Sequence, residues 1–321
     1  MRGIVKTAFA VLVLACAVAP ASAQSAEWDT GVEHYKKQEY RQAISEFQKV
    51  ADGAPDFANT YYYIGLSHFM LKEYGKSIVH LNRYVNLSEK GNAKPDPKAR
   101  AALGRAYLLT EDYPKAVTTL TVVTQAITDD PINFYYLGVA HQKLNQNDKA
   151  IEAYSAALKI SPKEVNTLDQ LTRLLLAKAI ASNVKPDWQA AITRAEQLRL
   201  VRDDATTATL LGNAYLGSGD FQKAAVHLGR AVESNPGDGN GWFNYGLSLS
   251  RSSQFPKAET ALQKATQLAP DNASAFAELG YVSESLKKYK EALAAYERAN
   301  QLNPNPQLQE AIERVRGVAG A

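Results

Sequence analysis

The sequence predicts an all-α fold, an α-solenoid of about eight helix–turn–helix units closed by a C-terminal capping helix. Three observations predict it. A repeat of 34 residues begins near residue 24, one position of the repeat is nearly always glycine, and each copy holds two apolar runs. These runs have the 3.6-residue period of an α-helix. One copy cannot bury its apolar faces alone, whereas stacked copies can.

The repeat extends over residues 24–306. We place its units near 24–57, 58–91, 97–130, 131–164, 165–204, 205–238, 239–272 and 273–306. The twentieth residue of a unit is Ala or Ser, and the seventeenth is mostly Tyr or Phe. The eighth residue is Thr172 in the fifth unit and glycine in the other seven, namely Gly31, Gly65, Gly104, Gly138, Gly212, Gly246 and Gly280.

Glycine in the first helix of each unit indicates that another helix comes close. A mid-helix glycine costs about 1 kcal/mol relative to alanine. We expect the alanine twelve residues later to supply the facing small surface. Proline ends the second helix of five units because it cannot continue a helix; these residues are Pro55, Pro162, Pro236, Pro270 and Pro304.

The chain after the last repeat predicts a capping helix and tail over residues 307–321. Leu308, Ala311, Ile312 and Val315 recur at helical spacing, with polar residues between them. An apolar face toward the last repeat and a polar face toward solvent is what a terminal cap needs.

Two places depart from the repeat. Residues 88–97 lengthen the connection between the second and third units, and Ala179–Asp187 predicts a longer internal turn in the fifth. Surface loops tolerate such insertions at small cost. Alternatively, residues 165–204 change the direction of the superhelix and divide the array into a four-unit and a three-unit half.

The small, aromatic and proline positions resemble those of the tetratricopeptide repeat family. The resemblance implies a right-handed α-solenoid whose first helices line a concave groove for a protein or peptide. The chaperone-type groove of this family grips a terminal carboxylate with Lys and Asn at the fifth and ninth positions. Only Arg105 could serve in that role here, so a carboxylate clamp is not supported.

The groove implied by the resemblance consists mainly of the fifth, ninth and twelfth residues of the units. Exposed apolar stripes mark interaction sites, and aromatic residues and Arg are common anchors. The alternative is that some of these rings pack between adjacent units. The candidate residues are Tyr35, Tyr62, Leu66, Phe69, Arg105, Tyr135, Val139, Lys143, Asn213 and Phe243.

The sequence contains no recognisable catalytic or metal-binding motif. No His-x-x-x-His or Cys-x-x-Cys spacing exists, and no nucleophile elbow or phosphate loop is present. We therefore expect no catalytic residue, no metal and no cofactor, and we expect that the protein is not an enzyme. The formal charge of +3 without a dense Lys/Arg block gives no footprint for nucleic acid.

Residues 1–23 predict a secretory signal peptide. Arg2 and Lys6 precede an apolar run over residues 8–19, and small residues 21–23 follow it. The run is too short for a membrane span, which needs roughly 20 apolar residues. We expect export, most simply to the periplasm of a Gram-negative bacterium. Cys16 leaves open a lipid anchor as the less favoured alternative.

Architecture and compartment together predict a non-enzymatic protein-binding scaffold or adaptor of the cell envelope. Its partner would be a protein or peptide held in the groove of the first helices. The alternative is a protein that binds polysaccharide or peptidoglycan within an envelope secretion or assembly machine, because aromatic rings also stack on sugar faces.

Overall fold

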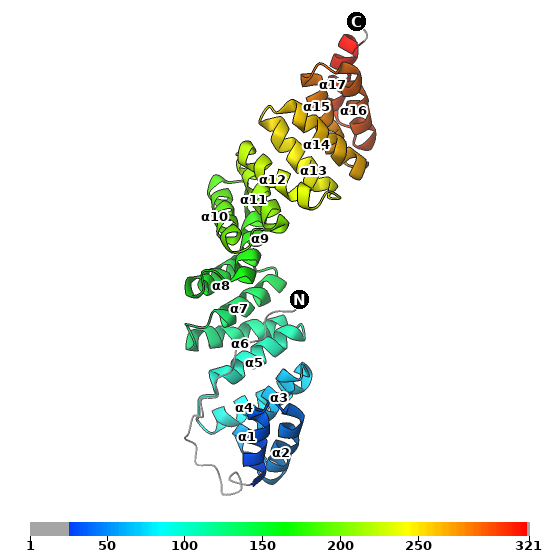
Figure 1. Ribbon diagram of the computed structural model, residues 1–321. Helices are drawn as coiled ribbons and strands as arrows, with labels where there is room; N and C mark the ends of the chain where they lie inside the picture. The colour runs from blue at the N-terminus through cyan, green and yellow to red at the C-terminus, as the bar shows by residue number, and fades with distance from the viewer. Residues whose placement is uncertain (1–25, 320–321) are drawn as a thin grey trace. The chain divides into compact units, whose positions relative to one another are not determined.

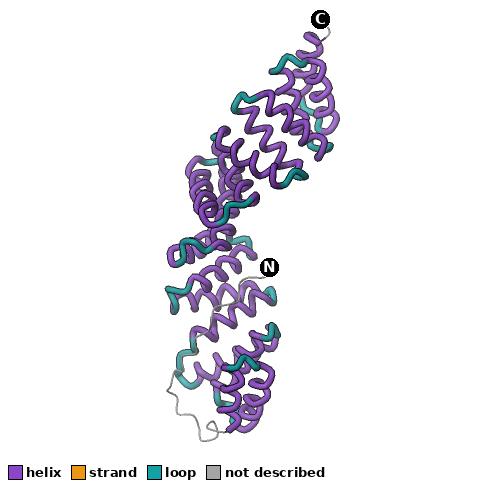
Figure 2. Tube along the Cα trace, viewed as in Figure 1, coloured by secondary structure: helices purple, strands orange, loops and turns teal. Residues whose placement is uncertain are grey.

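The computed structural model describes residues 26–319, and every regular element in that range is an α-helix. The predicted all-α repeat architecture is confirmed (Figures 1 and 2). The signal peptide predicted for residues 1–23 and the alternative lipid site at Cys16 lie outside the described residues. No helix within residues 26–319 combines the length and apolar character that a membrane span requires.

The chain divides into two compact halves, Met1–Ile160 and Ser161–Ala321. The boundary precedes the irregular fifth repeat, which therefore groups with the last three repeats. The helices of the first half are α1 (Ala26–Lys36), α2 (Tyr40–Gly53), α3 (Ala58–Met70), α4 (Tyr74–Lys90), α5 (Pro97–Leu109), α6 (Tyr113–Ala126), α7 (Pro131–Lys143) and α8 (Asn147–Ile160).

The second half begins with the long pair α9 (Val165–Ser182) and α10 (Lys185–Val201). It continues with α11 (Ala205–Ser218), α12 (Phe221–Ser234), α13 (Gly239–Arg251), α14 (Phe255–Leu268), α15 (Ala273–Ser285), α16 (Tyr289–Leu302) and α17 (Pro306–Ala319). Odd-numbered helices up to α15 are the first helices of repeats, and even-numbered helices are the second helices. Each helix packs against the next one within its half.

The glycine of each regular repeat faces a large side chain sixteen residues later. A Cβ on Gly212 would lie 2.6 Å from Cγ of Leu228, and one on Gly104 would lie 2.7 Å from Cγ of Leu120. Both leucines are fully buried. The residue twelve positions after the glycine is buried too, and in the second repeat the hydroxyl of Ser77 donates to the carbonyl of Gly65. The glycine therefore admits a large side chain between the two helices.

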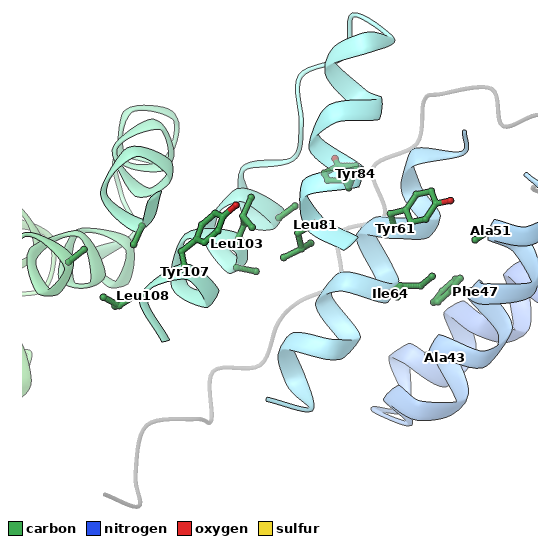
Figure 3. Close-up of a cluster of buried hydrophobic side chains, with 14 residues drawn as sticks. Ala43, Phe47, Ala51, Tyr61, Ile64, Leu81, Tyr84, Leu103, Tyr107 and Leu108 are labelled. Atoms are coloured by element: carbon green, nitrogen blue, oxygen red, sulfur yellow. The ribbon is translucent and has the colours of Figure 1, made fainter. Parts of the chain in front are cut away.

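The core of the first half is continuous from one repeat to the next. Phe47 of α2 lies beside Ile64 of α3, and Leu81 of α4 belongs to the same buried cluster as Leu103 of α5 (Figure 3). The buried side chains Phe47 and Leu81 on second helices thus pack both within their own repeat and against the following one. Because each second helix packs against the first helix of the next repeat, the first helices follow one another in chain order within this half.

The short turn inside most repeats contains a residue in the left-handed conformation. In six repeats this residue is not glycine, although left-handed backbone costs an ordinary residue about 1–2 kcal/mol. It is Gln38, Lys72, Glu111, Asn145, Ser253 or Lys287, each with φ near +60°. In the sixth repeat the position is Gly219, with φ of 86°.

The prediction of a longer turn over Ala179–Asp187 is wrong. α9 continues through Ser182 and α10 starts at Lys185, so only Asn183 and Val184 connect them. Residues 178–182 contain neither glycine nor proline, so α9 continues through them, and Pro186 stands in the first turn of α10, where a helix tolerates proline. Asn183 ends α9 with a φ of 52°.

The connection between the second and third repeats is long, as expected, but α4 absorbs its first residues and ends at Lys90. Residues 91–96 remain outside helices. Asp96 ends this connection as the N-cap of α5, where its carboxylate accepts from the backbone N–H of Lys98 at 2.7 Å. The backbone N–H of Asp96 donates to the hydroxyl of Tyr84 at 2.8 Å.

The last helix, α17, covers the eighth repeat. Ile312 and Val315 are buried and belong to one cluster with Tyr296 of α16. On its other side, the guanidinium of Arg314 donates two hydrogen bonds of 2.9 Å to the carboxylate of Glu284.

Candidate partner-binding surface

The candidate residues of the first half lie along α1, α3, α5 and α7. We define the first-helix strip as Tyr35, Tyr62, Leu66, Phe69, Arg105, Tyr135, Val139 and Lys143. Helix α3 packs against α5, and α5 packs against α7. The ring of Tyr35 on α1 contacts Tyr63 on α3, so the strip extends over four neighbouring repeats. Lys143 is exposed, and the other members are partly buried.

Tyr62 is held in place from three sides. Its ring packs edge-on against Tyr63 and Tyr84, with centroid distances of 5.1 and 5.2 Å. Its hydroxyl donates to Oδ2 of Asp96 at 3.4 Å. Burial raises the pKa of the Tyr62 phenol well above its usual range, so the ring is neutral at all physiological pH values. The ring is thus a rigid apolar face with an anchored polar tip.

The rings of the first two repeats form a chain of edge-on contacts. Tyr35 of α1 packs against Tyr63 of α3 at 5.1 Å and against Tyr40 of α2 at 5.7 Å. Phe69, at the other end of α3, packs against Tyr74 of α4 at 5.5 Å. These contacts support the expectation that some rings pack between adjacent repeats. They also leave each ring partly accessible, so packing and recognition are compatible here.

Arg105 is the one guanidinium of the strip. Its Nη2 donates to Oδ1 of Asn133 at 2.7 Å and lies 3.9 Å from Oδ2 of Asp130. The guanidinium also lies over the ring of Tyr136, 4.9 Å from its centroid. Its Nε is buried and has no hydrogen-bond partner among the described residues. Burial lowers the pKa of Arg105, although an arginine stays protonated in proteins.

Tyr135 and Val139 continue the strip on α7. The ring of Tyr135 contacts Tyr136 at 5.5 Å and Tyr154 of α8 at 5.8 Å. Val139 packs on the buried core of the first half. These residues therefore extend the apolar face beyond Arg105, so that the cation lies between two groups of apolar side chains.

The remaining candidates, Asn213 and Phe243, belong to the second half. Nδ2 of Asn244 donates to Oδ1 of Asn213 at 3.1 Å, which links α11 to α13. Phe243 is partly buried against a cluster that includes Leu249. Both residues lie in the unit Ser161–Ala321 and are not members of the first-helix strip, which is defined on the first half.

Residues that the sequence analysis did not single out hold the strip in place. Tyr63 and Tyr136, at the sixth position of their repeats, support the rings and Arg105. Asn133 accepts a hydrogen bond from Arg105, and Tyr84 packs against the ring of Tyr62. The sequence signal for Tyr63 and Tyr136 is that both are aromatic residues at the sixth position of a repeat. Within residues 26–319, no three or more His, Cys, Asp or Glu side chains form a group that could hold a metal ion.

Comparison with known protein families identifies the repeat. Tetratricopeptide repeat models match residues 29–92, 209–249, 246–305 and 134–164, together more than half of the chain. The chain belongs to the tetratricopeptide repeat family. Repeats of this family generally act as protein-interaction scaffolds and are typically not catalytic.

Known proteins with the same repeat differ widely from this tetratricopeptide repeat chain. Mouse superkiller complex protein 3 is 24% identical over 182 residues, which cover 45% of this chain and only 12% of that protein. A crystal structure of YrrB, titled a TPR protein with an unusual peptide-binding site, has a TM-score of 0.53 and 20% identity. It covers 61% of this chain and 97% of YrrB, and it supports the fold. A crystal structure of MamA has a TM-score of 0.48 and 22% identity, covering 55% and 93% of the two chains.

Proposed function

We propose that this tetratricopeptide repeat protein is a non-enzymatic scaffold of the cell envelope that holds a partner protein or peptide on its first-helix strip. The strip carries the proposal, because its rings stay partly accessible while side chains around them hold them rigidly. Tyr62 is fixed by Tyr63, Tyr84 and Asp96. Rigid aromatic side chains lose little entropy on binding and are frequent anchors of interfaces.

The family and one similar structure support binding of a protein or peptide. YrrB has this fold and is titled as having a peptide-binding site. Partner binding on the first helices is also compatible with the geometry, since α3, α5 and α7 pack in order and present one continuous surface. Export to the periplasm is part of the proposal and is supported by the signal-like residues 1–23.

In-cell photo-cross-linking tests the proposed function. A benzophenone amino acid replaces Phe69 or Tyr135 in the strip, and a control variant carries it at Val79, which is 64% exposed on α4. We expect one discrete protein partner to be cross-linked from residues 69 and 135 and not from residue 79. Equal capture from all three positions, or capture of glycan instead of protein, would contradict the proposal.

Compartment needs its own measurement. Mass spectrometry of the mature N-terminus distinguishes cleavage after Ala23 from lipidation of Cys16. We expect a mature chain that begins at Gln24 in the periplasmic fraction. An intact Met1 in the cytoplasmic fraction would contradict export without affecting the binding site.

A further inference from the structure

The first helices of repeats three and four carry Lys and Arg but no acidic residue, and the first helix of repeat two carries neither. Helices α3, α5 and α7 contain no Asp or Glu. Their four basic residues, apart from histidines, are Lys98, Arg100, Arg105 and Lys143. Among the other first helices, α1, α9 and α15 contain acidic residues, whereas α11 and α13 also lack them and carry one Arg between them. Counted over Lys, Arg, Asp and Glu, α3 is therefore uncharged, and α5 and α7 carry only positive charge.

Half of this positive charge is not paired with a carboxylate within the described residues. Lys98 and Lys143 are exposed and make no ion pair with any residue in the described range. Arg105 is paired with Asp130 at 3.9 Å and also donates to Asn133 at 2.7 Å. The guanidinium of Arg100 likewise pairs with a carboxylate, that of Glu89 on α4.

The two carboxylates at the ends of these helices are already engaged. Asp96 accepts from the backbone N–H of Lys98 at 2.7 Å. Asp130 accepts from the backbone N–H of Ile132 and from Nδ2 of Asn133, both at 2.9 Å. Both carboxylates act as helix N-caps, and neither forms an ion pair with Lys98 or Lys143, which stay available to an outside anion.

Apolar and cationic groups alternate along this surface. Tyr62 and Leu66 lie on α3, which packs on α5 and its Arg105. Tyr135 and Val139 lie on α7, which also packs on α5. Lys98 occupies the second position of its repeat, on the same stripe as Arg105. A ligand that matches this order needs aromatic or aliphatic side chains with carboxylates between them.

We infer that the first-helix strip, together with the neighbouring Lys98, selects an extended, acidic peptide segment whose apolar side chains contact the rings and whose carboxylates face Lys98, Arg105 and Lys143. The inference rests on the proposed function and adds the charge of the partner. Exposed ion pairs contribute little affinity each, whereas charge complementarity governs encounter rate and selection between partners. The preference is therefore for acidic over basic segments and weakens as salt screens the charges.

Fluorescence anisotropy with two probe peptides tests the inference on the full chain. One short, end-blocked peptide alternates Glu with Tyr, Leu and Val, and the other carries Lys at every Glu position. We expect the Glu peptide to bind about tenfold or more tightly than the Lys peptide at low salt, with a smaller ratio at high salt. An equal or reversed preference would overturn the inference and leave peptide binding intact. Binding of neither peptide would count against the inference and against the proposed function together.

Matched variants place the effect on the strip. K98Q together with K143Q removes two exposed cations, so the fold is preserved. K149Q together with K159Q removes two exposed cations of α8 and causes the same change in net charge. We expect only the first pair to weaken binding of the Glu peptide, by about three- to tenfold. An equal loss in both pairs would show a non-specific charge effect and overturn the inference.

Discussion

Gly138 of α7 lies directly against the ring of Tyr154 of α8. A Cβ on Gly138 would stand 2.7 Å from Cδ1 and Cε1 of that ring. Tyr154 is fully buried, and its hydroxyl donates to Oε1 of Gln142 at 2.9 Å. The ring cannot move aside without losing that hydrogen bond. The same relationship recurs at sixteen-residue spacing in the other regular repeats and determines how closely their helices pair.

Replacement of Gly138 by Ala should therefore destabilise the protein, although alanine is the better helix former. We expect a loss of about 1–3 kcal/mol, the usual cost of overpacking a core, measured by urea unfolding. The control is Gly75→Ala on α4, where an added Cβ meets nothing within 4 Å. That variant should be neutral or slightly more stable. A G138A protein as stable as wild type would show that the contact is not tight.

We expect the fifth repeat to reverse the sizes of this pair. Thr172 stands at the glycine position, and the position of the large side chain, counted after the insertion, is Ala195. Both residues are fully buried. We expect T172G and A195L each to destabilise the second half, by cavity formation and by overpacking respectively. The double variant should lose less than the sum of the two, and strict additivity in urea unfolding would contradict the exchange of sizes.

Glu111 occupies a left-handed turn position with φ of 64°, where the sixth repeat has Gly219. E111G should raise the free energy of unfolding, because glycine adopts this backbone without steric strain. Part of the gain of about 1–2 kcal/mol is offset by the greater freedom of glycine in the unfolded chain. E111A is the control and should give no increase. A lower midpoint of thermal unfolding for E111G would exclude strain at this turn.

His80 of α4 makes the stability of the second repeat depend on pH. It stacks on His68 at 5.4 Å, and burial, aided by the charges of His68 and Arg83, lowers the pKa of His80 to about 4. The unfolded chain has a histidine pKa near 6.5 and binds more protons between these values. The contribution of His80 to the free energy of unfolding should thus be fully present above pH ~6.5 and be lost as the pH decreases toward ~4. H80Q should flatten this slope in thermal unfolding, whereas N86Q on the same helix should not. An unchanged slope in H80Q would contradict the assignment.

The helices could be predicted from sequence because the 34-residue repeat is visible in the recurring glycines. In-phase glycines and alternating apolar runs locate nearly every helix pair. The turn of the fifth repeat could not be predicted, because an insertion of helix-forming residues fits a longer loop and a longer helix equally well. The partner of each glycine was also missed, since Leu, Phe and Tyr are all acceptable sixteen residues later and share no residue identity.

The strip shows the same limit at the level of side chains. The positions of Tyr62, Arg105 and Tyr135 on first helices follow from the repeat register. Their supports do not, because the contact of Tyr62 with Tyr84 depends on how α4 packs against α3. The hydrogen bond from Arg105 to Asn133 likewise depends on the placement of α7 beside α5. Register predicts which residues share a surface, and packing decides how far each is buried.

Methyl NMR of the full chain, titrated with the Glu-containing probe peptide, tests the central claim most directly. The first-helix strip carries the methyl groups of Leu66 and Val139, and second helices carry those of Val79 and Val122, which are exposed. We predict that the signals of Leu66 and Val139 shift on binding while those of Val79 and Val122 stay in place. Shifts confined to Val79 and Val122, or no shifts at saturating peptide, would contradict the assignment of the binding surface to the first helices.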